Sequence, residues 1–159
     1  MTVFWLGQAG LLFEFDGVKV TVDPYLSNSV EKVEPKNYRR QPIDESFFDI
    51  KPDILILTHN HLDHTDPETL ERLFSKHGGI CVLASGNAWQ TARKFGGDNN
   101  YVMFNRGTVW TEKGIKFEAV YAEHSDDKAI GVIISYGCRN YYITGDTLYN
   151  KRVIKDINI

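Results

Sequence analysis

Histidine is concentrated in one short stretch of this chain. The segment "ILTHNHLDHTD", residues 56–66, contains three of the five histidines in the sequence, with an aspartate among them. At this composition the pattern HxHxDH would arise by chance in about 4 of 10,000 such chains. Four metal-capable side chains that project together leave lone pairs unsatisfied unless a cation organises them. The stretch therefore predicts a metal site.

The spacing within this stretch indicates two neighbouring ions. His59 and His61 lie two positions apart on an extended segment, so both imidazoles point the same way and can reach one ion. Asp63 and His64 follow where the chain bends towards a helix, and they face a different place. A helical HExxH motif instead gathers two histidines around one zinc, and closed structural zinc sites use thiolates. Nitrogen and carboxylate ligands with incomplete shells are typical of a catalytic centre.

Two further ligands are expected at strand ends elsewhere in the chain. His124 follows the β-rich run "IKFEAVYA", and Asp146, in "YYITGDT", ends the strand of the last hairpin. A histidine at a strand end is usually a capping or surface residue, and an aspartate in a Gly-Asp turn usually serves the turn. Because the shell formed by the histidine stretch is incomplete, we interpret both residues as metal ligands.

The first part of the chain predicts the elements that position this site. "TVFWLG", "LLFEFD" and "VKVTVD" indicate an antiparallel meander, with a hairpin turn at Asp16-Gly17. "DILILT", residues 53–58, has the consecutive aliphatic residues of a strand covered on both faces. Asp66 then matches an N-cap, with Pro67 at the first position of an amphipathic helix that Gly78-Gly79 ends.

The rest of the chain predicts alternating strands and helices and then strands alone. "ICVLA", "NAWQTARKF" and "YVMF" indicate strand, helix and strand, with parallel pairing. From residue 108 onward, "TVW", "IKFEAVYA", "AIGVIISY" and "NYYITGD" indicate strands, and "LYNKRVIKDINI" indicates the start of a helix. The polar stretch from Pro24 to Pro52 is too long for an idle connection and is expected to carry function or to be mobile. No linker or repeat is visible, so we expect a single domain over 1–159.

Composition and charge narrow the classes of partner. The net charge is −3, with scattered Lys and Arg that form neither a basic stripe for nucleic acid nor a polybasic membrane anchor. No apolar run approaches the length of a membrane span, and the N-terminus lacks the pattern of a signal peptide. We therefore expect a cytoplasmic location. Cys81 and Cys138 lie far apart in sequence, and both are expected to be reduced structural thiols.

Together these residues resemble the metallo-β-lactamase superfamily. The likeness covers essentially the whole chain and consists of four ordered pieces: Asp23 in "VTVDP", "HNHLDH" at 59–64, the isolated His124, and Asp146 in "TGDT". The opening "FWLGQAG" and the phrase "TGDTLYN" further resemble a branch that includes ascorbate-6-phosphate lactonases. The resemblance implies an α+β fold, an αββα sandwich with the metal site at one edge of the paired sheets.

The resemblance also implies a role for each site residue. The implied ligands divide between two ions: the first takes His59, His61 and His124, and the second takes Asp63 and His64 with Asp146 as a bridge. Asp23 would be a supporting carboxylate that holds the histidine loop in place. The alternative for Asp23 is a strand-end residue that starts a turn. Up to two divalent ions would be the cofactor; zinc is favoured for imidazole with carboxylate, and Mn²⁺ or Fe²⁺ fit nearly as well.

One piece of the family pattern is missing from this chain. The pattern ends with a further histidine for the second ion, well beyond the bridging aspartate, and the chain stops 13 residues after Asp146. The remaining histidine, His77, falls at the end of the helix after the cluster, where we expect it to interact with the helix C-terminus. We expect the domain to be a fragment that lacks its usual C-terminal portion. A partner subunit that completes it, or a weakly held second ion, are the alternatives.

The activity that the resemblance implies is that of a metal-dependent hydrolase. The nucleophile would be a metal-bound hydroxide, with Asp63 and Asp146 as catalytic residues, and Asp63 would orient the hydroxide or pass a proton to the leaving oxygen. The favoured bond is ester-like, in a lactone of a phosphorylated sugar acid. Lys36, Arg39 and Arg40 in the long polar loop could meet the anionic group of this small molecule, although solvated loop charges are the commoner case.

Several other functions use the same residues. A phosphodiesterase or nuclease needs the same ions, and so does a hydrolase of thioesters or glutathione conjugates. A non-catalytic metal-binding or interaction domain is the contrasting class. No nucleic-acid or membrane partner is expected, and the sequence leaves homo-oligomer formation open.

Overall fold

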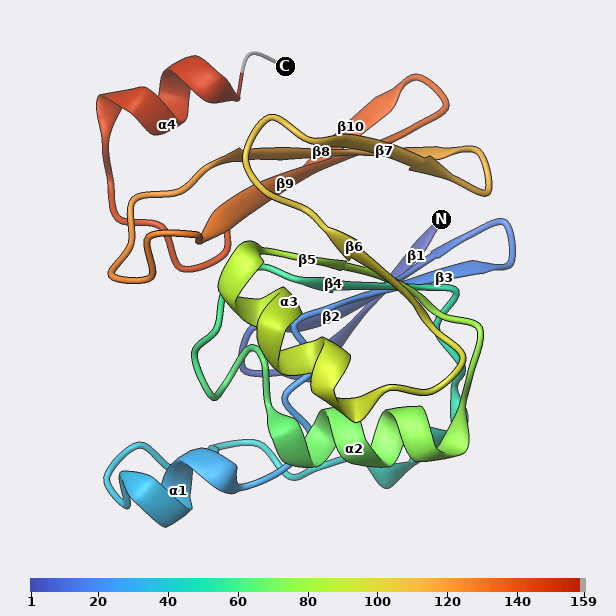
Figure 1. Ribbon diagram of the computed structural model, residues 1–159, viewed down its shortest axis with the longest axis vertical. Coiled ribbons are helices and arrows are strands. Elements are labelled where there is room, and N and C mark those ends of the chain that lie inside the picture. The colour runs from blue at the N-terminus through green and yellow to red at the C-terminus, as the bar shows by residue number, and fades with distance from the viewer. Residues whose placement is uncertain (158–159) are drawn as a thin grey trace.

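The computed structural model describes residues 1–157, and in this part of the chain two β-sheets pack face to face (Figure 1). The six-stranded sheet contains, in spatial order, β1 (Thr2–Gly7), β2 (Gly10–Phe15), β3 (Val18–Val22), β4 (Ile54–Leu57), β5 (Cys81–Ala84) and β6 (Asn100–Met103). The four-stranded sheet contains β10 (Arg139–Ile143), β9 (Ile130–Tyr136), β8 (Ile115–Tyr121) and β7 (Val109–Glu112).

Helices lie on the outer sides of the two sheets. Helices α2 (Pro67–Lys76) and α3 (Gly86–Ala92) cover the six-stranded sheet, and a short 3₁₀ turn η2 (Arg93–Phe95) extends α3 (Figure 1). Helix α4 (Lys151–Asp156) contacts β8 of the other sheet. This layering confirms the expected αββα sandwich and the α+β class.

The strand pairing follows the sequence pattern. Strands β1 to β3 form an antiparallel meander, and Asp16 and Gly17 both have positive φ in the turn between β2 and β3, as expected of a two-residue hairpin. Strands β3 to β6 pair in parallel. All four residues of β4 are buried because the other sheet covers one face and the helices cover the other.

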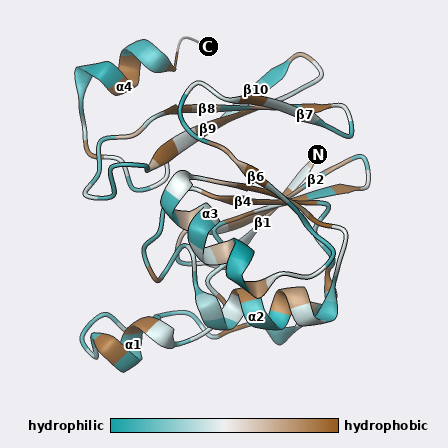
Figure 2. Cartoon of the chain, in the orientation of Figure 1, coloured by the Kyte–Doolittle hydropathy of each residue, from teal (hydrophilic) through white to brown (hydrophobic). Residues whose placement is uncertain are grey.

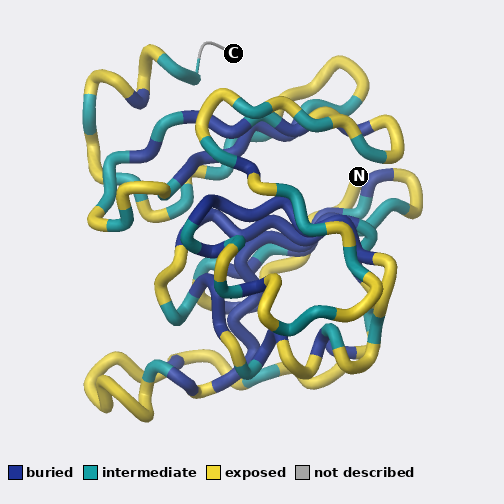
Figure 3. The backbone as a smooth tube through the Cα atoms, in the orientation of Figure 1, coloured by how far each residue is buried: buried dark blue, intermediate teal, exposed yellow. Residues whose placement is uncertain are grey.

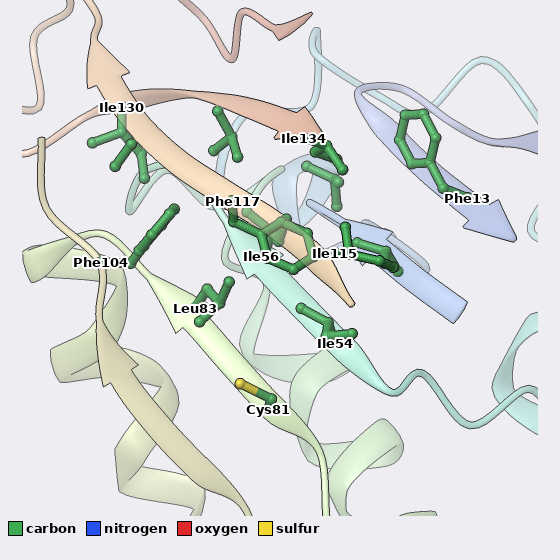
Figure 4. Close-up of a cluster of buried hydrophobic side chains, with 14 of the residues drawn as sticks. Phe13, Ile54, Ile56, Cys81, Leu83, Phe104, Ile115, Phe117, Ile130 and Ile134 are labelled. Carbon is green, nitrogen blue, oxygen red and sulfur yellow. The ribbon is translucent and has the colours of Figure 1, made fainter. Parts of the chain in front are cut away.

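The main core lies between the two sheets. Ile54 and Ile56 of β4 point into it and meet Phe117 of β8 and Ile134 of β9 (Figure 4). The alternate residues of β4 pack on the opposite side, against the apolar face of α2. Figure 2 shows that α2 carries hydrophilic and hydrophobic residues side by side, as an amphipathic surface helix does. Burial on both faces fixes β4 in position, and His59 follows two residues after it.

Asp66 caps the N-terminus of α2, as predicted. Its side chain accepts hydrogen bonds from the N–H groups of Glu68 and Thr69, and Pro67 occupies the first turn. Asp66→Ala is expected to lower the free energy of unfolding by about 1–2 kcal/mol, since two N–H groups lose their acceptor. Urea unfolding measures this, with Asp66→Asn as the control that keeps a capping oxygen. Equal losses in the two variants would contradict a capping role.

The long connection after β3 contains short helical turns. It forms α1 (Ser29–Val33) and a 3₁₀ turn η1 (Glu45–Asp49), and most of its residues between α1 and η1 are exposed (Figure 3). Arg39 is the exception, and the expectation of a solvated or ligand-facing charge is wrong for it. Its buried guanidinium donates to the carbonyl oxygens of Leu6, at 2.6 Å, of Gln41, at 2.8 Å, and of Tyr25.

The two cysteines differ in their burial. Cys81 is buried in the core, as expected, whereas Cys138 is exposed in the turn between β9 and β10, so it is not the buried structural thiol that was expected. Both are free. Among the helices in residues 1–157, none is long and apolar enough to cross a membrane.

Candidate metal centre

The candidate site lies at one edge of the sandwich, where strands of both sheets end. Strands β3 and β4 are parallel, so Asp23, directly after β3, and His59, two residues after β4, meet at this edge. Strands β8 and β10 both run antiparallel to β9, so they also end together. His124 and Asp146 each follow three residues after one of these ends. The topology therefore brings together segments that are far apart in the sequence.

Three imidazoles form the first cluster. His59, His61 and His124 each offer a ring nitrogen, and these atoms lie within 4.8 Å of one another. The ring centroid of His59 is 4.8 Å from that of His61 and 4.4 Å from that of His124. These are the three residues assigned to the first ion, and the structure brings them together.

The hydrogen bonds around His59 leave one nitrogen for a ligand. The Thr58 hydroxyl donates to Asp23, so it can only accept from Nδ1 of His59, 3.1 Å away. The other nitrogen, Nε2, is buried and has no hydrogen-bond partner in the described residues. Burial and the neighbouring His64 lower the pKa of His59 to about 4, which keeps the imidazole neutral at physiological pH. An orphaned buried lone pair among three imidazoles fits a divalent cation.

Acidic side chains surround His64 and form the second cluster. Nδ1 of His64 lies 2.9 Å from an oxygen of Asp23, and Nε2 lies 3.3 Å from Asp146 and 3.9 Å from Asp63. Burial alone would lower the pKa of His64, but hydrogen bonds to Asp146 and Asp23 and their charges raise it to about 10. The hydrogen bond to His64 lowers the pKa of Asp146 to about 2. Both acids assigned to the second ion therefore lie near the same nitrogen of His64.

Asp23 sits behind the ligands. Its Oδ1 accepts from the N–H of Thr58 at 2.8 Å, and its Oδ2 accepts from the Thr58 hydroxyl and faces His64. Asp23 lies close enough to His59 and His64 to count with them as a metal-binding group. Because its oxygens already accept these hydrogen bonds, we interpret it as a support that orients His64 and the end of β4. The roles of all seven site residues stay predictions.

Gly145 allows Asp146 to reach the site. Its φ is +57°, and an added Cβ would lie 3.0 Å from the carbonyl oxygen of Ile130 and 3.3 Å from Thr58. The turn after β10 therefore packs tightly against the end of β4, and a side chain at this position would force its neighbours to shift.

The sequence reasoning missed Asp126. This residue accepts hydrogen bonds from the N–H of Asn60 at 2.8 Å and from the Asn87 side chain at 2.6 Å, and so ties the segment between His59 and His61 to α3. Its N–H also contacts Nδ1 of His124 at 3.1 Å. Its position two residues after His124 was the only feature of the sequence that could have pointed to Asp126. Its hydrogen-bond partners Asn60 and Asn87 are distant in sequence, so spacing does not reveal them.

Asp126→Ala is expected to weaken metal binding about 10- to 100-fold while leaving the fold intact, because the support of two ligand segments is lost. A calorimetric titration of the chelator-treated protein with zinc measures this affinity. Asp127→Ala is the matched control, since Asp127 is exposed, forms an ion pair with Lys128 and accepts a hydrogen bond from Asn87. A variant at 126 that binds metal like the wild type would contradict the supporting role.

Comparison with known proteins identifies the family. A family model described as "Beta-lactamase superfamily domain" matches residues 2–142. The chain belongs to the beta-lactamase superfamily. A UPF0173 metal-dependent hydrolase of Thermoplasma acidophilum is 29% identical over 160 residues, which cover 95% of this chain and 62% of the relative. The N-acyl-phosphatidylethanolamine-hydrolyzing phospholipase D 1 of Caenorhabditis elegans is 27% identical over 164 residues, covering 90% of this chain and 46% of the relative.

A solved structure shows the same fold. The isothiocyanate hydrolase from Delia radicum gut bacteria superposes with a TM-score of 0.75 at 20% identity, covering 98% of this chain and 66% of that chain. The expected metallo-β-lactamase-like fold is thus confirmed for the beta-lactamase superfamily domain described here. The domain spans 62% of the length of the Thermoplasma relative.

Two hollows flank the metal-ligand candidates of this superfamily domain. One, of about 510 Å³, borders His61 and Asp63 and is walled by the long connection after β3. The other, of about 240 Å³, borders Asp23 and Asp146. The candidate ligands therefore lie between two spaces that a small molecule can enter.

Proposed function

We propose that the protein is a metal-dependent hydrolase of an ester-like bond, and that its substrate is a lactone of a phosphorylated sugar acid. The observation that carries the hydrolase proposal is the convergence of His59, His61 and His124 beside the acids Asp63 and Asp146. Divalent ions held by these residues would lower the pKa of a bound water and polarise the substrate oxygen. The naming of the Thermoplasma relative as a metal-dependent hydrolase supports the same class.

The two proposed catalytic acids are accessible, unlike the groups behind them. The side chain of Asp63 is 39% exposed and that of Asp146 is 50% exposed, whereas Asp23 and His64 are buried. Asp63 also borders the 510 Å³ hollow, where it can orient a nucleophile or accept a proton from it. The two proposed catalytic acids therefore lie on the solvent-accessible side of the cluster.

The proposed substrate follows from two sequence phrases, and the proposed metal follows from the chemistry of its ligands. The lactone is proposed because "FWLGQAG" and "TGDTLYN" resemble the ascorbate-6-phosphate lactonase branch. Zinc is proposed because imidazole with carboxylate suits it, with Mn²⁺ or Fe²⁺ as alternatives. A small anionic substrate, a cytoplasmic location and homo-oligomer formation stay predictions.

A phosphodiesterase is the second candidate function. The Caenorhabditis elegans relative is a phospholipase D by name, and phosphodiester hydrolysis uses the same kind of paired ions. It predicts cleavage of bis-p-nitrophenyl phosphate. A non-catalytic metal-binding domain predicts bound metal with no turnover.

Elemental analysis of the purified protein, together with a substrate panel, tests the proposal. The panel contains a sugar-acid lactone and its phosphorylated form, a simple ester, a thioester and bis-p-nitrophenyl phosphate. We expect bound divalent metal and fastest turnover of the phosphorylated lactone, both lost on chelation. Fastest turnover of the phosphodiester would favour the second candidate, and metal without any turnover would refute the hydrolase.

A further inference from the structure

The hollow beside His61 and Asp63 has the dimensions of a small-molecule site. Its volume of about 510 Å³ falls within the range of roughly 300–1,000 Å³ usual for such pockets. The metal-ligand candidates border one part of it, and its wall comes from α1 and the residues that follow. The lining includes the apolar side chains Val30, Val33 and Leu62 and the polar side chains Lys36, Tyr38 and Arg40.

Two cations in this wall have no acidic partner. Among residues 1–157, Lys36 and Arg40 form no ion pair, although other cations near the same connection do. Lys32 pairs with Glu68 and Arg72 pairs with Glu45, each at 2.5 Å. Both side chains are exposed and line the hollow, so their charges can reach a ligand there.

In the part of the chain that the structure describes, neither acid that lines the hollow forms an ion pair with these cations. Glu34 also lines it, and its carboxylate accepts a hydrogen bond from the Asn37 side chain at 2.5 Å. Asp63 belongs to the proposed catalytic group. The guanidinium of Arg40 lies over the ring of Tyr38, 5.2 Å from its centroid, a cation–π contact that orients it without removing its charge.

Arg39 anchors the connection that carries these cations. Its guanidinium binds backbone carbonyl oxygens on three sides, including that of Leu6 in β1 and that of Tyr25 after β3. Gly7 accommodates this contact, because a Cβ there would lie 2.1 Å from a nitrogen of Arg39. Gln8, the next residue, lines the same hollow. The hydrogen bonds of Arg39 therefore hold the neighbouring residues of the connection against the first hairpin.

We propose that Lys36 and Arg40 form the subsite for a phosphate monoester on the substrate. This inference rests on the proposed function. Two unpaired cations match the two negative charges of a phosphate monoester. The apolar side chains Val30, Val33 and Leu62 contact the carbon skeleton. The scissile bond then lies towards His61 and Asp63.

The double variant Lys36→Ala/Arg40→Ala tests the subsite with two matched substrates, 6-phosphogluconolactone and gluconolactone. We expect kcat/KM for the phosphorylated lactone to fall about 10-fold or more, through KM, because charge-assisted hydrogen bonds are lost. For the neutral lactone it should stay within about twofold of wild type, since that substrate carries no group for these cations. Lys32→Ala/Arg72→Ala is the matched control, which removes two paired cations that do not line the hollow. Equal effects of the double variant on both lactones would overturn the proposal.

Calorimetric binding separates failure of the subsite from failure of the proposed function. The two probes are 6-phosphogluconate and gluconate, which share one carboxylate and differ in the phosphate. We expect wild-type protein to bind the phosphorylated acid about 10-fold or more tightly than the other, and the Lys36/Arg40 variant to lose this preference. That result supports the subsite even if no lactone is turned over. Equal binding of both acids by the wild type would overturn the subsite whatever the catalytic result.

Discussion

His61→Ala is expected to lower metal content and hydrolytic turnover together, turnover by more than 100-fold. Loss of residues that only support metal ligands already costs about 10- to 100-fold, and His61 supplies a nitrogen of the three-imidazole cluster itself. The side chain is exposed, so its removal leaves no buried cavity. The free energy of unfolding of the chelator-treated protein should therefore change by less than about 0.5 kcal/mol.

Metal content by elemental analysis and turnover of the best panel substrate check this prediction in one preparation. His77→Ala is the matched control, because His77 lies at the end of α2, away from the cluster. Its side chain contacts the carbonyl oxygen of Phe48 at 2.9 Å and not the helix C-terminus that was expected. This variant should keep both metal and activity. Asp146→Ala should reduce both, like His61→Ala. Full turnover by His61→Ala with its metal stripped would refute the metal-dependent mechanism.

The strands and helices were predictable because local patterns specify them. Four consecutive aliphatic residues predicted a doubly covered β4, and Asp66-Pro67 predicted where α2 begins. The histidine stretch was found from its spacing. His124 and Asp146 were then inferred because the shell of that stretch is incomplete and both residues follow β-rich runs. The prediction extended the last strand to Asp146, but β10 ends at Ile143. Local patterns place an element more reliably than its ends.

Two side chains could not be predicted because their partners come from distant segments. Arg39 reads as a loop charge, yet the carbonyl oxygens of Leu6 and Tyr25 satisfy it in a buried position. In the sequence Asp126 is one of several polar residues in a row, yet its carboxylate accepts hydrogen bonds from both Asn60 and Asn87. Whether a charged side chain is buried depends on the backbone groups that the fold brings to it, and sequence spacing does not contain that information.

Asp23→Ala is expected to lower the free energy of unfolding by about 3–5 kcal/mol, the usual cost of removing one partner of a buried charged pair. The carboxylate accepts from Thr58 N–H and the Thr58 hydroxyl and contacts Nδ1 of His64. All these groups are buried, so water cannot replace the lost acceptor without opening the structure. Urea unfolding in the presence of chelator measures the loss. Asp49→Ala is the control, because its ion pair with Lys76 is exposed and should contribute little to stability.

The stability gained on metal binding tests whether Asp23 orients the metal ligands or only stabilises the fold. A ligand at about 100 times its Kd adds about 2.7 kcal/mol to stability, so excess metal should raise the wild-type unfolding midpoint clearly. Asp23→Ala should gain less from the same metal concentration, because His64 and the end of β4 lose their orientation and affinity falls about 10- to 100-fold. Asp23→Asn keeps one oxygen as an acceptor for Thr58 N–H, but its amide NH₂ would face the Thr58 hydroxyl and Nδ1 of His64. This variant should therefore recover part of the stability and little of the metal affinity. If Asp23→Ala gained as much from metal as the wild type does, Asp23 would stabilise the fold without orienting the ligands.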